Sequence, residues 1–308
     1  MQLENKKILV TGGAGFIGSH LVDLLVAKNS VIVADNLMPE KRKTLNEKAK
    51  YVNIDLLDIE SVSSVVNKFD LVVHLAANPL ASVTDSSEMM ENIRMTHNIL
   101  EAMKENNVKS IAFASSAIIY GNAPAPTKES FGPLKPHSLY AASKLACEAL
   151  ISSYCHSFSM KSWIFRFANV GGPRLRHGPP HDFIVKLRKN PSELEVLGDG
   201  TQLRCYLEVN DCVKGILKVI ETTDDAVNIV NLGAEDVISI KRIAEIVIEE
   251  MKVKAKIRFT AKEPKGWKGD VRIFQPDITL AKSLGWKPKY TSEQTVRETV
   301  RSLIKEGP

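Results

Sequence analysis

Three glycines, placed where an apolar run gives way to an amphipathic one, constrain this chain more than any other feature. Lys7 to Val10 is typical of a short buried strand, and Phe16 to Lys28 carries apolar residues at helical spacing. Between them stand Gly12, Gly15 and Gly18, in the pattern G-x-x-G-x-x-G. Glycines also occur in tight turns for purely steric reasons. A glycine turn between strand and helix, however, lets a pyrophosphate approach the backbone at the helix N-terminus, so the segment predicts a dinucleotide-binding βαβ unit.

A carboxylate follows at the distance that such a unit requires. The second expected strand, Ser30 to Asp35, ends in Asp35, where an acidic side chain accepts hydrogen bonds from ribose hydroxyls and repels a 2′-phosphate. This favours NAD over NADP. The nearby basic run, residues 41–43, either holds a 2′-phosphate or is a solvated helix face. Asp55 either meets the adenine amino group or caps a local helix.

The alternation of β-branched and amphipathic segments predicts an α/β fold with a doubly wound parallel sheet of about seven strands. The expected strands are Lys7–Val10, Ser30–Asp35, Tyr51–Asn53, Leu71–Leu75, Ser110–Ser115, Ser162–Phe167 and Val227–Leu232. The expected helices include Phe16–Lys28, Ile59–Asn67, Glu88–Asn106, Asp182–Arg188, a helix capped by Asp211, and Ile240–Met251.

The composition of the chain changes near residue 170, where the segment GGPRLRHGPP, rich in Gly, Pro and Arg, breaks regular structure. We therefore expect an NAD-binding domain over residues 1–170, to which the chain returns at about 207–231. Residues 171–308 then form mostly a smaller α/β lobe that binds the substrate.

Composition and charge exclude several classes of protein. The net charge of +5 is too small to argue for nucleic acid but suits a small polyanionic ligand. Four cysteines without a C-x-x-C motif suggest neither a zinc site nor a disulfide framework, so we expect no metal and a reducing, cytoplasmic setting. The N-terminus lacks the apolar region of a signal peptide, and no apolar run reaches the roughly 18 residues of a membrane span, so no membrane partner is expected.

A phenol and an ammonium stand four residues apart in the segment that opens at Tyr140. This spacing places Tyr140 and Lys144 on one helical face, where the cation, with a positive nicotinamide ring, would lower the pKa of the phenol and make it a useful base. Ser115 and Ser116 end the fifth strand, at the sheet edge where open α/β folds bind ligands. His74 ends the fourth strand and is expected to be a buried, hydrogen-bonded structural residue rather than a catalytic one.

Nearly the whole chain resembles the extended short-chain dehydrogenases/reductases, and most closely the UDP-glucose (UDP-galactose) 4-epimerases. The segments that carry the resemblance are TGGAGFIGSH, VADN, HLAA, SSAIIYG, PHSLYAASK, RFANVGGPR, GDGTQLRCYLEVND, KGDV and SLGWKP. The resemblance implies that Tyr140 is the catalytic base, that Lys144 holds the nicotinamide ribose, and that Ser116 orients the sugar.

Further residues are expected to bind the two ligands. Those expected at the NAD cofactor are Gly12, Gly15, Phe16, Ile17, Gly18, Asp35, Asn36, Asp55, Leu56, Leu75, Ala76, Ala77, Asn92, Tyr140 and Lys144. Those expected at a nucleotide-sugar substrate, a UDP-hexose, are Ser116, Tyr140, Asn169, His177, Arg204 and Asp270. His177 is equally compatible with an ordinary loop residue.

Relatives that dehydrate or decarboxylate nucleotide sugars carry an acidic residue where this chain has Ala117. The resemblance therefore implies 4-epimerisation of UDP-glucose and UDP-galactose through a 4-keto sugar, with NAD retained. Three departures from the family pattern, at Pro79, Pro179–Pro180 and Trp267, leave the sugar and the nucleotide base open, although bulky Phe274 weakly favours sugars without an N-acetyl group.

Two other readings stay open. The first is another nucleotide-sugar epimerase or an NAD(P)-dependent reductase, and the second is a non-catalytic nucleotide sensor. Relatives also pair through two helices per subunit, which would correspond here to Glu88–Asn106 and Leu139–His156, so a homodimer with a four-helix contact is expected.

Overall fold

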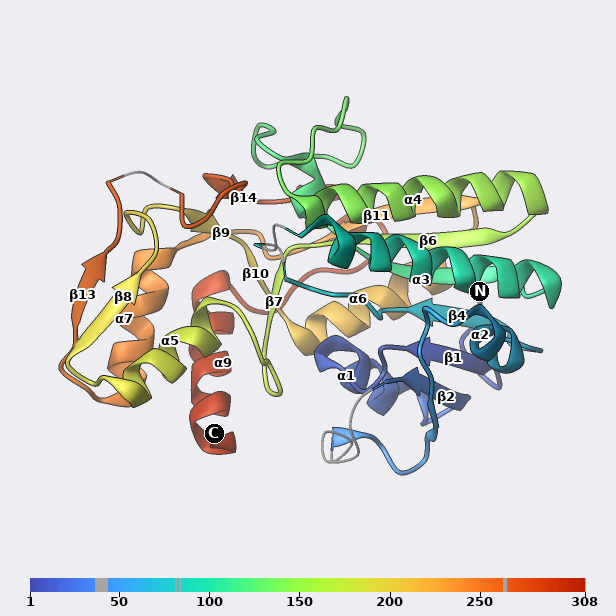
Figure 1. Ribbon diagram of the computed structural model, residues 1–308, viewed down its shortest axis with the longest axis horizontal. Helices are drawn as coiled ribbons and strands as arrows, with labels where there is room; N and C mark the ends of the chain where they lie inside the picture. Colours follow the sequence, from blue (N-terminus) through green and yellow to red (C-terminus); the bar gives the residue numbers. More distant parts are fainter. Residues whose placement is uncertain (37–43, 81, 83–84, 263–264, 308) are drawn as a thin grey trace. The chain divides into compact units, whose positions relative to one another are not determined.

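The computed structural model describes residues 1–36, 44–80, 82, 85–262 and 265–307, and in this range the chain forms two compact units (Figure 1). Unit 1 comprises Met1–Ser116, Leu139–Arg166 and Ile216–Val230. Unit 2 comprises Ala117–Ser138, Phe167–Gly215 and Asn231–Pro308. The division differs from the expected boundaries, because residues 117–138 group with unit 2 and the return to unit 1 begins at Ile216. The basic run at residues 41–43 lies outside the described residues.

Unit 1 contains the predicted seven-stranded sheet, with strand order β11-β6-β5-β4-β1-β2-β3. The strands are β1 (Lys7–Thr11), β2 (Ser30–Asp35), β3 (Lys50–Asn53), β4 (Leu71–His74), β5 (Ser110–Ser116), β6 (Lys161–Phe167) and β11 (Val227–Leu232). Neighbouring strands are parallel, and the order reverses between β1 and β4. The carboxyl ends of β1 and β4 therefore meet at the topological switch point, the place where doubly wound sheets bind ligands.

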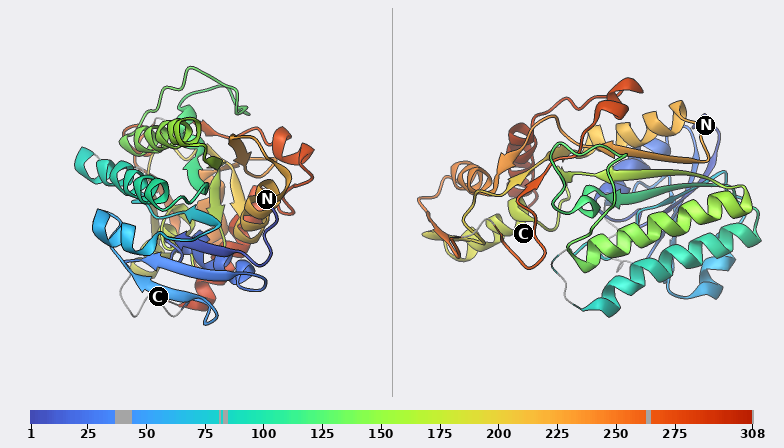
Figure 2. Two further views of the ribbon diagram at one scale, coloured as in Figure 1. Left: turned by 90° about the vertical axis from the view of Figure 1, so that its right-hand side faces the viewer. Right: turned by 90° about the horizontal axis from the view of Figure 1, so that it is seen from above.

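Helices flank this sheet. They are α1 (Phe16–Leu25), α2 (Ile59–Val65), α3 (Ser86–Glu105), α4 (Leu139–Phe158) and α6 (Val209–Thr222), of which the last begins in unit 2. The two long helices α3 and α4 lie side by side in both views of Figure 2. This arrangement confirms the predicted doubly wound α/β fold.

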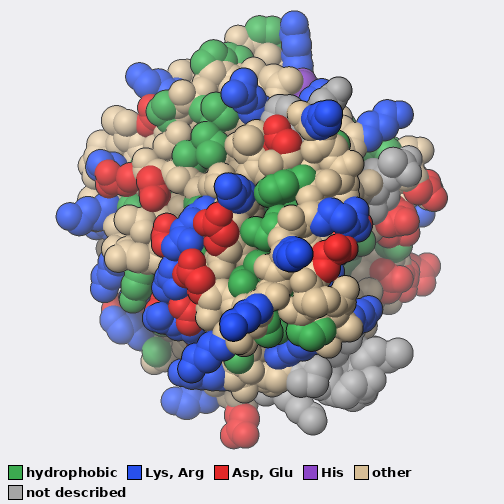
Figure 3. All heavy atoms as spheres, turned by 90° about the vertical axis from the view of Figure 1, so that its left-hand side faces the viewer, with side chains coloured by type: hydrophobic (Ala, Val, Ile, Leu, Met, Phe, Trp, Pro, Cys, Tyr) green, Lys and Arg blue, Asp and Glu red, His purple; other side chains and the backbone are tan. Residues whose placement is uncertain are grey.

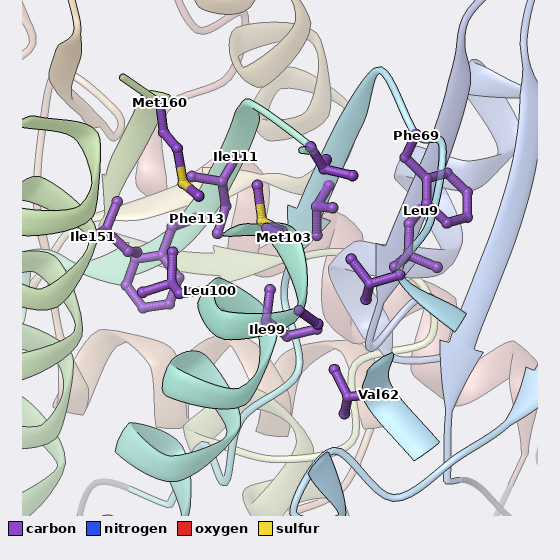
Figure 4. Close-up of a cluster of buried hydrophobic side chains, with 14 of the residues drawn as sticks. Leu9, Val62, Phe69, Ile99, Leu100, Met103, Ile111, Phe113, Ile151 and Met160 are labelled. Carbon is purple, nitrogen blue, oxygen red and sulfur yellow. The ribbon is translucent and has the colours of Figure 1, made fainter. Parts of the chain in front are cut away.

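An apolar core binds α2, α3 and α4 to one face of the sheet, as Figure 4 shows. Leu9 from β1, Ile111 from β5 and Ile99 from α3 are fully buried there, together with Ile151 from α4. Burying such a side chain contributes about 1.5–3 kcal/mol. Because every sheet strand except β3 is largely buried, the strands consist of nearly continuous β-branched and apolar residues.

Unit 2 consists of shorter elements. They are the 3₁₀ turn η2 (Ala117–Tyr120), β7 (Asn169–Gly171), α5 (Pro179–Lys189), β8 (Glu193–Val196), β9 (Leu203–Arg204), β10 (Tyr206–Glu208), β12 (Ile238–Ser239), α7 (Ile240–Met251), β13 (Lys256–Phe259), β14 (Ile273–Phe274), α8 (Thr279–Ser283) and α9 (Ser292–Glu306). The strands form small sheets, β10-β7, β12-β9-β14 and β13-β8, and helices α5, α7 and α9 pack against one another.

One predicted helix start is wrong. Helix α6 begins at Val209 rather than after Asp211, because the Glu208 carboxylate accepts the Asp211 N–H at 3.0 Å and so performs the capping. Asp211 instead lies in the first turn and is buried. Its carboxylate accepts the Lys289 N–H at 2.6 Å, and its carbonyl accepts the Trp286 indole N–H at 3.1 Å.

Candidate active site

The glycine turn joins β1 to α1 in unit 1 and leaves no room for side chains. Gly12 has a φ of +67°, and a Cβ atom there would lie 2.6 Å from the Ala76 nitrogen. A Cβ at Gly18 would lie 2.2 Å from the Gly12 carbonyl oxygen. Gly15 is the N-cap of α1 and supplies no side-chain cap, so Phe16 and Ile17 open the helix with their N–H groups at its positive end.

Asp35 lies directly beside this turn. Its carboxylate accepts the Ala14 N–H at 3.0 Å, although the two residues come from different ends of the βαβ unit. Asp35 is buried at the end of β2, and the exposed Asn36 follows it. The glycine turn and the predicted ribose carboxylate thus lie together, as a dinucleotide site requires.

Asp55 does not cap a helix. The N-cap of α2 is Asp58, whose side chain accepts the Glu60 N–H, whereas Asp55 accepts the Leu57 N–H at 2.9 Å. The capping alternative is therefore wrong. Contact between exposed Asp55 and an adenine stays a prediction, and the adjacent Leu56 is buried in the core.

The loop after β4 approaches the same turn. The Leu75 N–H donates to the Thr11 carbonyl at 3.1 Å, and Ala76 and Ala77 follow. Asn92 on α3 is almost fully buried behind this loop, and its amide oxygen accepts the Asn78 N–H at 2.7 Å. The Asn92 amide nitrogen donates to the hydroxyl of Ser143 on α4 at 3.2 Å. In this arrangement Asn92 ties the loop after β4 to helix α4.

His74 is the structural residue that the sequence predicts. It is 1% exposed, and its ring nitrogens are hydrogen-bonded to the hydroxyls of Thr11, at 2.7 Å, and Thr96, at 3.2 Å. Burial, reinforced by the charge of Lys144, lowers the pKa of His74 to about 3, so the ring stays neutral. The imidazole thus links β1 to α3 without exchanging protons near neutral pH.

Tyr140 and Lys144 lie in the first two turns of α4. The Lys144 ammonium is buried, donates to the Ala114 carbonyl at 2.7 Å, and lies 5.8 Å from the centre of the Tyr140 ring. Burial lowers the pKa of Lys144 to about 8, against the opposing effects of Cys147 and Glu148. The ammonium is therefore mostly charged at neutral pH and faces the phenol.

The protein's own groups do not by themselves lower the pKa of Tyr140. Burial raises the pKa of the Tyr140 phenol above its usual value, because the phenolate loses hydration, and the nearby Cys147 raises it further. Any lowering of this pKa must then come from a further positive charge beside the phenol, such as an oxidised nicotinamide ring.

The two serines that end β5 have different environments. Ser115 is buried, and its hydroxyl donates to Glu148 Oε1 at 2.5 Å. Ser116 is only partly buried, and neighbouring strand residues point to opposite faces. Ala117 follows and is buried, so no carboxylate stands at that position.

Sequence reasoning missed Glu148 and Arg166, which form a buried ion pair close to these residues. The sequence contains a partial signal for Glu148 but none for its partner. Tyr140, Lys144 and Glu148 recur every four residues, and Glu148 interrupts an otherwise apolar, small-residue stretch of α4. That Arg166 is its partner depends on the adjacency of β5 and β6, which only the structure reveals.

In unit 2 the structure brings together Arg204 and Asp270. Arg204 Nη2 lies 2.5 Å from Asp270 Oδ1, and the other oxygen of Asp270 accepts the Gly266 N–H at 3.0 Å. Asn169 on β7 donates its amide to the carbonyl of Cys205, the residue after Arg204, at 3.2 Å. His177 is exposed in the loop before α5. The roles of these four residues at a substrate stay predictions.

The four cysteines carry free, buried thiols. Within the described ranges, no cluster of histidine, cysteine, aspartate or glutamate has the arrangement of a metal site. In the same part of the chain, no helix is long and apolar enough to cross a membrane.

The donor set of unit 1 fits an NAD cofactor. A Cβ atom at Gly12 or Gly18 would collide with the protein's own backbone, so the turn requires glycines. Asp35 lies beside this turn, and Tyr140 and Lys144 lie in the first two turns of α4. When bound, NAD supplies a site that accepts and returns hydride.

Comparison with known proteins agrees with this geometry. Residues 8–233 match the family described as NAD dependent epimerase/dehydratase. A putative UDP-glucose 4-epimerase of Methanocaldococcus jannaschii is 33% identical over 95% of this chain and 97% of its own length. A UDP-N-acetyl-alpha-D-glucosaminuronate decarboxylase of Bacillus cytotoxicus is 32% identical over 96% of this chain and 97% of its own length.

A solved UDP-galactose 4-epimerase has the same fold. It superposes with a TM-score of 0.89 at 39% identity, covering 97% of this chain and 99% of its own. The glycine turn, Asp35 beside it, and the Tyr140–Lys144 pair therefore occur in a chain that belongs to the NAD-dependent epimerase/dehydratase family of nucleotide-sugar enzymes, within the extended short-chain dehydrogenases/reductases.

Proposed function

We propose that this enzyme interconverts UDP-glucose and UDP-galactose by oxidation and re-reduction at C4 of the sugar, with NAD retained throughout. The observation that carries the proposal is the placement of a buried ammonium 5.8 Å from the Tyr140 ring, in the same unit as Ser116 and the glycine turn. The similarity to UDP-hexose 4-epimerases supports the choice of substrate.

Each side chain then has a defined role. Tyr140 accepts the proton of the sugar 4-hydroxyl as C4 loses hydride, and returns the proton when the 4-keto sugar is reduced on its other face. Lys144 keeps a positive charge beside the phenol and holds the nicotinamide ribose. Ser116 orients the sugar hydroxyl, and the Arg204 guanidinium, held by Asp270, binds the diphosphate.

Ala117 supports epimerisation over elimination or decarboxylation. A dehydratase must remove a second proton from the sugar and protonate a leaving hydroxyl, which requires a further acid or base beside the serine. The buried methyl group of Ala117 can do neither. Proton transfer by Tyr140 alone is sufficient for reversible oxidation at C4.

A second candidate is epimerisation of another nucleotide sugar, which the varied activities of the relatives favour. The segment Trp267–Asp270 departs from the epimerase pattern that the resemblance predicts. The carboxylate of Asp270 pairs with Arg204 and accepts the Gly266 N–H. A different contact with the nucleotide would leave the C4 chemistry unchanged.

We also propose a homodimer, paired through the outer faces of α3 and α4, and a cytoplasmic location. Met90 on α3 is a large apolar side chain that is 58% exposed, and small side chains such as Ala149 lie on the exposed face of α4. The four free thiols are compatible with a reducing compartment.

The proposal is tested by incubating the purified protein with UDP-galactose, without added cofactor, and separating products by anion-exchange chromatography. We expect UDP-glucose to form. Consumption of UDP-galactose that requires added NAD(P)+ and forms an equal amount of NAD(P)H would indicate a reductase that runs here in the oxidative direction and exchanges its cofactor. No product, even with NAD added, would exclude this substrate and direct the assay to other nucleotide sugars.

A further inference from the structure

Glu148 is an acidic side chain where α4 packs on the sheet. It follows Lys144 by one helical turn and Tyr140 by two, so all three share one face of the helix. Its side chain is only 5% exposed. Burying a carboxylate is costly unless it is paired and hydrogen-bonded, so its partners explain why it is tolerated.

Those partners come from two neighbouring strands. Arg166 on β6 donates from Nη2 to Glu148 Oε2 at 2.7 Å and from Nε to Oε1 at 3.1 Å. Ser115 on β5 donates its hydroxyl to Oε1 at 2.5 Å. The Arg166 side chain is also 5% exposed, so this cluster excludes water. One carboxylate therefore fastens α4 to both β5 and β6.

These contacts lie next to Ser116 and Lys144, two of the residues that the proposed chemistry uses. Ser115 precedes Ser116 in the chain, so fixing Ser115 fixes the end of β5. The Lys144 ammonium is bounded by Tyr140 and Cys147 on its own helix, by Ala114 and Phe113 of β5, and by neutral His74 of β4. The nearby Glu148 charge raises the pKa of Lys144 against the effect of burial.

We propose that Glu148, locked by Arg166, is a positioning residue that sets the placement of Ser116 against Tyr140 and Lys144 and places a negative charge one helical turn from Lys144. The part that concerns sugar turnover rests on the proposed function, whereas the effect on Lys144 does not. The alternative is that the pair only stabilises the fold.

The first test replaces Glu148 by Gln, which keeps the size of the side chain and removes its charge. We expect kcat to fall about 100-fold with little change in KM, because a displacement of about 1 Å of the reacting groups costs that much in rate.

The same variant tests the charge of Lys144. Without the negative charge of Glu148, Lys144 loses its proton at a lower pH. Activity on the alkaline side should therefore fall off at a lower pH than in the wild type, and a lysine-selective NMR titration, assigned with Lys144→Met, should show the same shift directly.

The second test removes both charges, in the variant Glu148→Met with Arg166→Met. Apolar replacements of a buried ion pair often preserve stability. We expect this variant to fold and to bind NAD while its kcat stays as low as that of Glu148→Gln. Recovery of the wild-type kcat would overturn the inference and assign the pair to stability alone.

The matched control is Asn228→Ala on β11, which removes buried hydrogen bonds to the carbonyls of Ser162 and Asp225 in the same unit. We expect a lower Tm and an unchanged kcat. An unshifted Lys144 titration in Glu148→Gln would refute the electrostatic part of the inference. A shifted titration in an enzyme that does not turn over UDP-hexoses would refute the proposed function and leave the electrostatic part intact.

Discussion

At the scale of single residues, the phenol of Tyr140 shows why the composition of a motif does not determine its pKa. The spacing of Tyr140 and Lys144 could be predicted because helical periodicity places them on one face. The pKa of the phenol could not, because it depends on how much water the fold removes. Burial raises the pKa of Tyr140 and lowers that of Lys144 to about 8. Burial therefore opposes the charged form of both groups, whereas the motif alone suggests a phenolate beside an ammonium.

Replacing Tyr140 by Phe removes the proton acceptor and leaves the ring in place. We expect turnover of UDP-galactose to fall by at least about 100-fold, the usual contribution of a general base. NAD should stay bound, since the glycine turn and Lys144 are untouched, and absorbance of the purified protein reports it.

The matched control is Tyr154→Phe, which removes a second phenol from α4, one that donates to Glu101. We expect this variant to keep near-normal turnover. Normal activity in Tyr140→Phe would disprove the assignment of the base.

Other residue contacts could not be predicted from sequence because they join segments distant in the chain. The Ala14–Asp35 hydrogen bond was implicit in the βαβ pattern. The Glu148–Arg166 pair and the Arg204–Asp270 pair were not, since each depends on which strands become neighbours. Arg204 and Asp270 were predicted singly, as substrate contacts, and their mutual salt bridge appears only in the fold.

At the scale of elements, prediction was best where periodicity runs longest. The expected helices of unit 1 match α1, α2 and α3 to within three residues at each end, because each presents an apolar face to the core. The two-residue strands β9, β12 and β14 are too short to show alternation. Helix α9 was missed although Thr291 and Gln294 form a capping box that marks its start.

Charged side chains join two helices of unit 2, and Figure 3 shows acidic and basic side chains interleaved on the face that includes α7. Arg242 of α7 lies 2.8 Å from Glu293 of α9, and Arg297 of α9 lies 2.7 Å from Glu250 of α7. These side chains are partly exposed, and ion pairs in contact with solvent contribute about 0.2–1 kcal/mol each, and more when networked. These contacts therefore add modestly to the packing of α7 against α9.

Replacing Arg297 by Ala should lower the free energy of unfolding by about 1 kcal/mol at low salt. The loss should shrink in molar salt, which screens charges that are partly exposed to solvent. Urea unfolding at two salt concentrations measures both effects, with Lys254→Ala, an exposed charge of the same unit, as the control. An equal loss at both concentrations would show that packing, not charge, joins the helices.

At the scale of the whole molecule, unit 1 could be predicted and unit 2 only in outline. Unit 1 repeats one βαβ rule, and right-handed crossovers leave few alternative topologies for its sheet. Unit 2 is assembled from segments 117–138, 167–215 and 231–308, which the sequence does not mark as partners. The buried Asn231 illustrates this, because its amide bonds to Tyr120, Thr127 and Asp277 from distant parts of that unit.

The proposed dimer is the property of the whole molecule that sequence and structure together make testable. Helices α3 and α4 lie side by side (Figure 2), and a second copy would cover their outer faces. A close four-helix contact tolerates small side chains and excludes long charged ones. Replacing exposed Ala149 by Arg should therefore produce a folded monomer, measured by size-exclusion chromatography with light scattering. The control Ser64→Arg, on α2, should stay dimeric. A monomeric wild-type protein, or a dimer that persists in Ala149→Arg, would place the contact elsewhere or remove it.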